Sequence, residues 1–195
     1  MSEHSGDSPD SGNSGNSGNS GDATPPRIEA FIHAAADYVR RSLGGVELPA
    51  DLPAALAYVD HYLTKTRSAG PVTDEILLLV ATAIGAWFGE RARQELGGHW
   101  ELDGEPANWR VALDAVELRF APVGMAAEAL RGAEVDGFPA SLATRKAFTP
   151  QLEAAFEAVG PVDEAYYYSL TGRYETILHA LEVVAELTKR ATEKN

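Results

Sequence analysis

The chain has 195 residues, no cysteine and a formal net charge of −13 at pH 7. The lack of cysteine excludes disulfides, a thiol nucleophile and cysteine-ligated zinc or iron–sulfur sites. The acidic balance argues against nucleic acid and anionic membrane as partners, because phosphate binding needs clustered Lys and Arg. With 45% hydrophobic and 23% charged residues, the composition is that of an ordinary globular protein, which we expect to be cytoplasmic.

The first 23 residues predict a disordered tail. Three Ser-Gly-Asn triplets run from Ser11 to Asn19, and the segment lacks the basic start and apolar run of a secretory signal. Such a composition buries too little apolar surface to offset the entropy lost on ordering. We therefore expect residues 24–195 to form a single helix-rich domain.

Helix-start and helix-stop residues divide the next 70 residues or so. Thr24 followed by Pro25 predicts the start of a first helix, which ends at Gly44-Gly45. A second helix follows Asp51 and ends before Gly70-Pro71. Thr73 caps a third helix, which is apolar almost all round from residue 76 to residue 88 and is therefore expected to be the central buried one.

Two glycines give this third helix an unusual face. Gly85 and Gly89 lie four residues apart, so they share one face and allow another backbone to approach closely. Glycine in a helix interior costs about 1 kcal/mol against alanine, which predicts a packing or functional reason for the pair. Gly97-Gly98 ends the helix.

Alternating apolar residues after this helix predict an antiparallel hairpin. The inward-facing positions are Trp109, Val111, Leu113, Val116, Leu118 and Phe120. With Asp114-Ala115 as a two-residue turn, Leu113 faces Val116 and Val111 faces Leu118. Asp-Ala is not a preferred turn pair, so a longer loop stays open. Residues 100–102 supply a candidate third strand.

Helical spacing returns after Pro122. It predicts a short helix over 125–130, a helix from Thr149 to Gly160, and a segment that begins at Asp163 and reaches the C-terminal region. Gly172 either breaks or kinks this last segment. The predicted fold class is α+β and mostly helical, with helices flanking a small two- or three-stranded antiparallel meander.

The run G-A-W-F-G-E (Gly85 to Glu90), then G-G-H-W (Gly97 to Trp100) and the strands leading to Pro122, resembles an uncharacterised bacterial domain family. That family of unknown function carries a G-x-aromatic-x-G-E helix followed by G-G-x-W and a short β-region. The resemblance covers roughly residues 73–135. It implies a fold unit and no established activity.

Glu90 and His99 are the candidate acid–base pair. Together they suggest a small hydrolase or ligand-binding enzyme with a pocket beside the meander. In the competing interpretation Glu90 serves the structure, bonding to the next strand's backbone, to Arg93 or to Arg119, and His99 is a loop residue. The sequence has no P-loop, dinucleotide-binding or nucleophile-elbow motif, which favours a non-catalytic protein.

A second group of candidate ligands lies near the C-terminus. Glu175, His179, Glu182 and Glu186 have helical spacing. They lie opposite the apolar stripe, so we interpret them as a solvated acidic face and predict neither a metal nor another cofactor.

Three consecutive tyrosines supply the candidate partner-binding residues. Tyr166, Tyr167 and Tyr168 must point in three directions on a helix, so at least one is expected to be exposed. Trp100 is a further candidate. The sequence therefore predicts a non-catalytic interaction or accessory protein of a bacterium, with another protein as its partner.

Overall fold

The computed structural model describes residues 24–42 and 44–193. The predicted tail, residues 1–23, lies outside the described residues. The longer helices are α1 (Pro26–Ser42), α2 (Leu52–Ser68), α3 (Asp74–Leu96), α4 (Pro122–Arg131), α5 (Thr149–Val159) and α7 (Leu170–Glu193). The short ones are the 3₁₀ helix η1 (Pro106–Asn108) and α6 (Glu164–Tyr167). The strands are β1 (His99–Glu101), β2 (Arg110–Leu113), β3 (Leu118–Phe120) and β4 (Leu142–Thr144).

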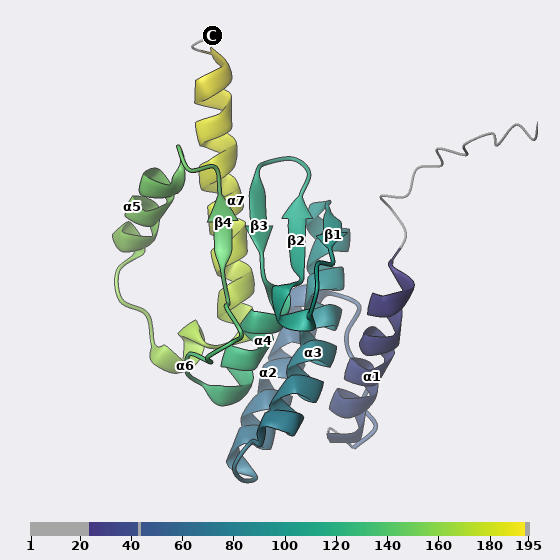
Figure 1. Cartoon of the computed structure of the whole chain (residues 1–195). Coiled ribbons are helices and arrows are strands. Elements are labelled where there is room, and N and C mark those ends of the chain that lie inside the picture. Colours follow the sequence, from purple (N-terminus) through teal and green to yellow (C-terminus); the bar gives the residue numbers. More distant parts are fainter. Residues whose placement is uncertain (1–23, 43, 194–195) are drawn as a thin grey trace, which may run out of the picture.

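These elements confirm a mostly helical α+β fold (Figure 1). The strands form one antiparallel sheet in the order β1-β2-β3-β4. The predicted meander of two or three strands thus gains β4, a strand that the sequence did not indicate. Helix α3 packs against β2 and helix α7 against β3, and Arg119 of β3 points away from the core and is exposed.

The predicted starts of the second and third helices are confirmed by their caps. The Asp51 carboxylate accepts a hydrogen bond from the Ala54 backbone at 2.9 Å, and the Thr73 hydroxyl accepts one from Ile76 at 3.4 Å. The first helix differs. It begins at Pro26, and the Thr24 hydroxyl donates to the Glu90 side chain.

Gly85 of α3 meets the backbone of α4, as predicted, whereas Gly89 meets the side chains of Pro122 and Trp100. A Cβ atom added to Gly85 would lie 2.5 Å from the Cα atom of Val123 in α4, and one added to Gly89 would lie 2.8 Å from Cγ of Pro122. Each glycine therefore allows a close approach that any side chain would prevent. At its end the helix reaches Gly97, whose φ of +74° suits glycine.

The predicted two-residue turn of the hairpin is wrong. Leu113 pairs with Leu118 and Val111 with Phe120, so residues 114–117 form a four-residue loop. The register moves by two residues, which keeps the same side chains on the inner face because side chains alternate with a period of two. The physical reason is the turn chemistry, since Asp-Ala lacks the residues that take positive φ in a two-residue turn.

The C-terminal segment breaks at Tyr168-Ser169, and Gly172 lies inside the first turn of α7. The start of α7 is held by a residue of α2. The Asp60 carboxylate accepts bonds from the backbone of Leu170 at 2.7 Å and of Thr171 at 3.1 Å, and from the Thr171 hydroxyl at 2.6 Å. This contact joins parts of the chain that are 110 residues apart.

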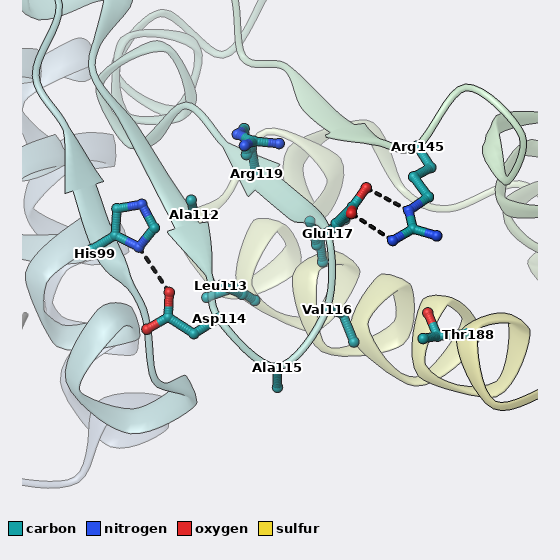
Figure 2. A pocket seen from close by; sticks show the side chains of 11 residues that line it. His99, Ala112, Leu113, Asp114, Ala115, Val116, Glu117, Arg119, Arg145 and Thr188 are labelled. Carbon is teal, nitrogen blue, oxygen red and sulfur yellow. Dashed lines mark hydrogen bonds and ion pairs between the residues drawn. The ribbon is translucent and has the colours of Figure 1, made fainter. Parts of the chain in front are cut away.

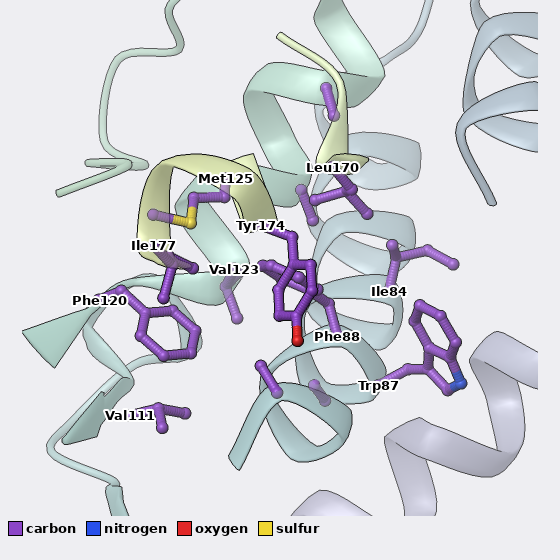
Figure 3. Close-up of a cluster of buried hydrophobic side chains, with 14 of the residues drawn as sticks. Ile84, Trp87, Phe88, Val111, Phe120, Val123, Met125, Leu170, Tyr174 and Ile177 are labelled. Atoms are coloured by element: carbon purple, nitrogen blue, oxygen red, sulfur yellow. The ribbon is translucent and has the colours of Figure 1, made fainter. Parts of the chain in front are cut away.

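The core lies where α3 meets α4, α7 and the inner face of the sheet (Figure 3). Phe88 of α3 is central to it. Its ring contacts Phe120 of β3 at a centroid distance of 6.1 Å and Tyr174 of α7 at 6.5 Å. Aromatic contacts of this kind add to the gain from burying the rings. The core thus fixes the helices on which the candidate site residues lie.

Candidate functional site

Glu90 is a buried structural acceptor. Only 2% of its surface is exposed, and its carboxylate accepts bonds from Arg93 Nε and Nη2, both at 2.9 Å, and from the Trp100 indole at 2.9 Å. Gln94 donates at 2.8 Å, and the Thr24 hydroxyl donates as well. With both oxygens engaged by several donors, this carboxylate joins α3, β1 and the start of α1.

Burial alone would raise the pKa of Glu90, but the hydrogen bonds from Arg93, Thr24 and Trp100 outweigh it and hold the pKa below the ordinary value. A general acid at neutral pH needs a raised pKa. The electrostatics therefore favour a structural carboxylate that is ionised at neutral pH.

His99 takes a different set of partners. Its ring is exposed, and Nδ1 lies 2.7 Å from the Asp114 carboxylate. Within the described part of the chain no hydrogen bond joins Glu90 and His99. The interpretation in which Glu90 pairs with Arg93 matches this geometry, and Arg119 pairs instead with Glu101 at 2.9 Å.

A hollow of about 360 Å³ lies at the β2–β3 hairpin beside His99 (Figure 2). Two pairs of its charged groups face each other, and Arg119 pairs with Glu101 outside the lining. Glu117 receives two hydrogen bonds from Arg145, and His99 faces Asp114. Thr188 also lines the hollow, but its hydroxyl donates to the Val184 carbonyl within α7. The arrangement suits a polar surface and assembles no activated nucleophile.

The three tyrosines take different environments, as their spacing predicts. Tyr166 is 38% exposed and Tyr167 is 47% exposed, whereas Tyr168 is half-buried. The rings of Tyr167 and Tyr168 meet edge to face at 5.0 Å. The expectation that at least one tyrosine of this run is exposed is therefore confirmed.

Exposed apolar side chains gather in the same segment. Nine large hydrophobic side chains are exposed among the described residues, and four of them lie within residues 159–167. We call these four the tyrosine surface: Val159, Val162, Tyr166 and Tyr167. A second, smaller group lies on α3: Ile76, Leu78 and Leu79. Exposed apolar residues that cluster are a mark of interaction sites, whereas scattered ones are normal.

Trp100 belongs elsewhere. Its indole donates to Glu90, and its ring packs edge to face on Trp109 at 6.5 Å. Trp100 lies on the edge strand β1, whereas α6 lies on the β4 side of the molecule (Figure 1). It therefore forms no single surface with the tyrosines.

A buried ion pair supports the tyrosine surface from beneath, and no sequence signal pointed to it. Arg173 of α7 and Glu128 of α4 are 7% and 8% exposed and form a hydrogen-bonded pair. The guanidinium carbon of Arg173 lies 4.2 Å from the Tyr167 ring centroid and 5.7 Å from that of Tyr168. Arg173 thus ties these rings to the domain.

Carboxylates adjoin the tyrosine hydroxyls. Tyr166 donates to Glu175, and this bond, with burial, raises the pKa of Tyr166 to about 12. Burial and then the negative charges of Glu134 and Glu128 raise the pKa of Tyr168. Both hydroxyls therefore stay protonated at physiological pH, and that of Tyr166 acts as a hydrogen-bond donor.

The proposed acidic face of α7 is only partly solvated. Glu182 and Glu186 are exposed, but His179 is half-buried against Phe156, with ring centroids 5.9 Å apart. Across residues 24–42 and 44–193, no group of three or more His, Cys, Asp or Glu side chains is arranged to hold a metal ion. Nor does this part of the chain contain a helix long and apolar enough to cross a membrane.

No protein-family model matches the chain, and no curated protein or solved structure shows significant similarity to it. The resemblance to a bacterial domain family of unknown function stays a prediction.

Proposed function

We propose that this chain is a non-catalytic interaction or accessory protein of a bacterium, which binds another protein through the tyrosine surface. The observation that carries the proposal is that residues 159–167 hold four of the nine large hydrophobic side chains that are exposed in the described part of the chain. Tyrosine is enriched at protein interfaces because its ring offers a large contact area and its hydroxyl a hydrogen bond. A cytoplasmic location is part of the proposal, in keeping with the cysteine-free sequence.

The placement of the ionisable groups supports this function over a hydrolase. Glu90 is fully engaged in bonds that join three elements, and His99 bonds to Asp114. Hydrolysis by such a pair would require both groups to face one bound substrate, each within hydrogen-bond reach of the atom whose proton it transfers. The geometry supplies a structural role for the carboxylate.

The test compares three proteins as bait in the native bacterial lysate. Val159→Ser with Val162→Ser removes apolar area at side chains that are 61% and 48% exposed. Val46→Ser with Leu79→Ser is the matched control, because these side chains are 47% and 53% exposed but lie before α2 and on α3. We expect the parent and the control to capture a partner protein that the Val159→Ser, Val162→Ser variant does not capture. All three proteins should have the same melting temperature. Identical capture by all three would contradict the proposal.

A further inference from the structure

We infer that the tyrosine surface recognises a basic partner segment, in which Lys or Arg side chains stand beside apolar ones. The inference rests on the proposed function and names the chemistry of the partner. It is carried by the charge around the exposed rings and by the way the structure already seats one guanidinium against them.

The surroundings of the tyrosine surface are acidic. Residues 157–175 contain four acids, Glu157, Asp163, Glu164 and Glu175, and a single base, Arg173. All four acidic residues are exposed. From neighbouring elements, Glu134 places negative charge near Tyr168 and Asp60 places it near Tyr166. Complementary charge at an interface speeds encounter and rejects partners of the wrong sign.

The single base of this segment leaves that charge in place. Arg173 is buried, and its charge is matched by Glu128 beneath the surface. Its guanidinium carbon lies 4.2 Å from the Tyr167 ring centroid, so this ring already accepts a cation from the protein side. Tyr167 is still 47% exposed. A Lys or Arg from a partner can therefore make the same kind of contact from the solvent side, where the carboxylates also attract it.

A second copy of the chain is a poorer occupant for this surface. In a two-fold dimer the same patch meets itself, which would bring the carboxylates around Glu164 and Glu175 against their own copies. Like charges facing each other across an interface are costly. Each copy also carries a net charge of −13, so the long-range field repels as well.

The test uses the full chain and three labelled synthetic peptides. The first alternates Lys and Leu, and the others replace every Lys by Gln or by Glu. Fluorescence anisotropy at about 0.1 M salt gives the dissociation constants. We expect the Lys peptide to bind at least about tenfold more tightly than the Gln peptide, and the Glu peptide to bind least. Equal binding of the Lys and Gln peptides would overturn the inference.

Two tyrosine variants test the ring itself. Tyr167→Leu keeps an apolar side chain but removes the aromatic face. It should raise the dissociation constant of the Lys peptide by about two- to tenfold. Tyr167→Phe keeps that face and should change binding by less than about twofold. Thermal melts verify that both variants fold. An unchanged dissociation constant for a folded Tyr167→Leu variant would contradict the cation–aromatic contact.

Two double variants, each of which removes two negative charges, distinguish binding at the tyrosine surface from general attraction to an acidic protein. Glu134→Gln with Glu164→Gln removes two charges beside the tyrosines. Glu75→Gln with Asp103→Asn removes two exposed charges from α3 and from the loop after β1. The first pair should weaken the Lys peptide by about threefold or more, and the second by less than about twofold. Equal losses would mean that the net charge alone attracts the peptide, and would overturn the inference.

A photo-crosslinking amino acid in place of Val162 separates this inference from the proposed function. Crosslinking in the native lysate followed by mass spectrometry identifies the partner segment. A segment with Lys or Arg beside apolar residues supports both. A segment without basic residues overturns the inference and leaves the proposed function standing. No crosslinked protein would overturn the proposed function together with the inference.

Discussion

We expect Glu90→Gln to lower the free energy of unfolding and to affect no enzymatic turnover. The substitution keeps the shape of the side chain but removes its charge and turns one acceptor oxygen into an amide donor. Arg93, Trp100, Gln94 and Thr24 all donate to the Glu90 carboxylate. In the variant the new amide NH₂ would face donors, and Arg93, itself 5% exposed, would lose its buried counter-charge.

The size of the effect follows from these contacts. Hydrogen bonds to a charged group contribute about 1.5–3 kcal/mol each. Removing one partner of a buried ion pair costs about 3–5 kcal/mol. The remaining amide oxygen keeps some of the bonds, so we expect a loss of about 3 kcal/mol in the free energy of unfolding. For a chain of this size that corresponds to a fall in melting temperature of about 6–12 °C.

The pKa of Glu90 determines how its contribution to stability changes with pH. The pKa of Glu90 is lowered in the folded protein from its ordinary value of 4.5. Its stabilising contribution is therefore complete above the unfolded pKa, and it is lost as the pH falls through the lower folded value. Urea denaturation at pH 7 and at decreasing pH gives the free energies of unfolding of the parent and of Glu90→Gln. The difference between the two should shrink as the pH falls. Equal stability at pH 7 would refute the argument.

A broad hydrolase substrate screen completes the experiment. We expect no substrate to be turned over by the parent. A substrate whose turnover is abolished by both Glu90→Gln and His99→Ala, with melting temperatures unchanged, would show that the pair is catalytic.

Three further predictions concern packing, capping and a second buried acid. Gly85→Ala should cost about 1–3 kcal/mol in urea denaturation, because its Cβ atom would lie 2.5 Å from the Val123 backbone. Asp60→Ala should cost about 1–2 kcal/mol by loss of the α7 cap, whereas Asp60→Asn, which keeps an acceptor, should cost less. Burial raises the pKa of Glu128, outweighing Arg173. Its contribution to stability is therefore present below the ordinary pKa of 4.5 and lost as the pH rises through the higher folded value. The free energy of unfolding of the parent relative to that of Glu128→Gln should fall with rising pH. A relative stability that increases with pH would contradict this.

The helices could be predicted because their signals are local. Asp51 and Thr73 each precede a helix that their side chain caps, and Gly70 and Gly160 follow helix ends. The burial of α3 could be predicted because apolar residues lie on nearly all sides of its axis. Each of these features depends on residues within a few positions of one another, so one sequence suffices to find them.

The elements and contacts that were missed depend on distant partners. Strand β4 has only three residues, and it is a strand because β3 pairs with it. Asp60 caps a helix that starts 110 residues later, and Glu128 meets Arg173 across 45 residues. A single sequence carries no signal for either pairing. The hairpin register was missed for a different reason, since a shift of two residues leaves the inward pattern unchanged.

The separation of Glu90 from His99 could have been argued from the strand itself. Successive side chains of a strand point to opposite faces. Trp100 brings its indole inward to Glu90, so its neighbour His99 must point outward, where it meets Asp114. The two candidate residues are thus on opposite sides of β1 for the same reason that the tryptophan is well placed to bond the acid. The closeness of an acid, a histidine and a tryptophan in this sequence therefore reflects a structural contact between the acid and the tryptophan, and the histidine takes no part in it.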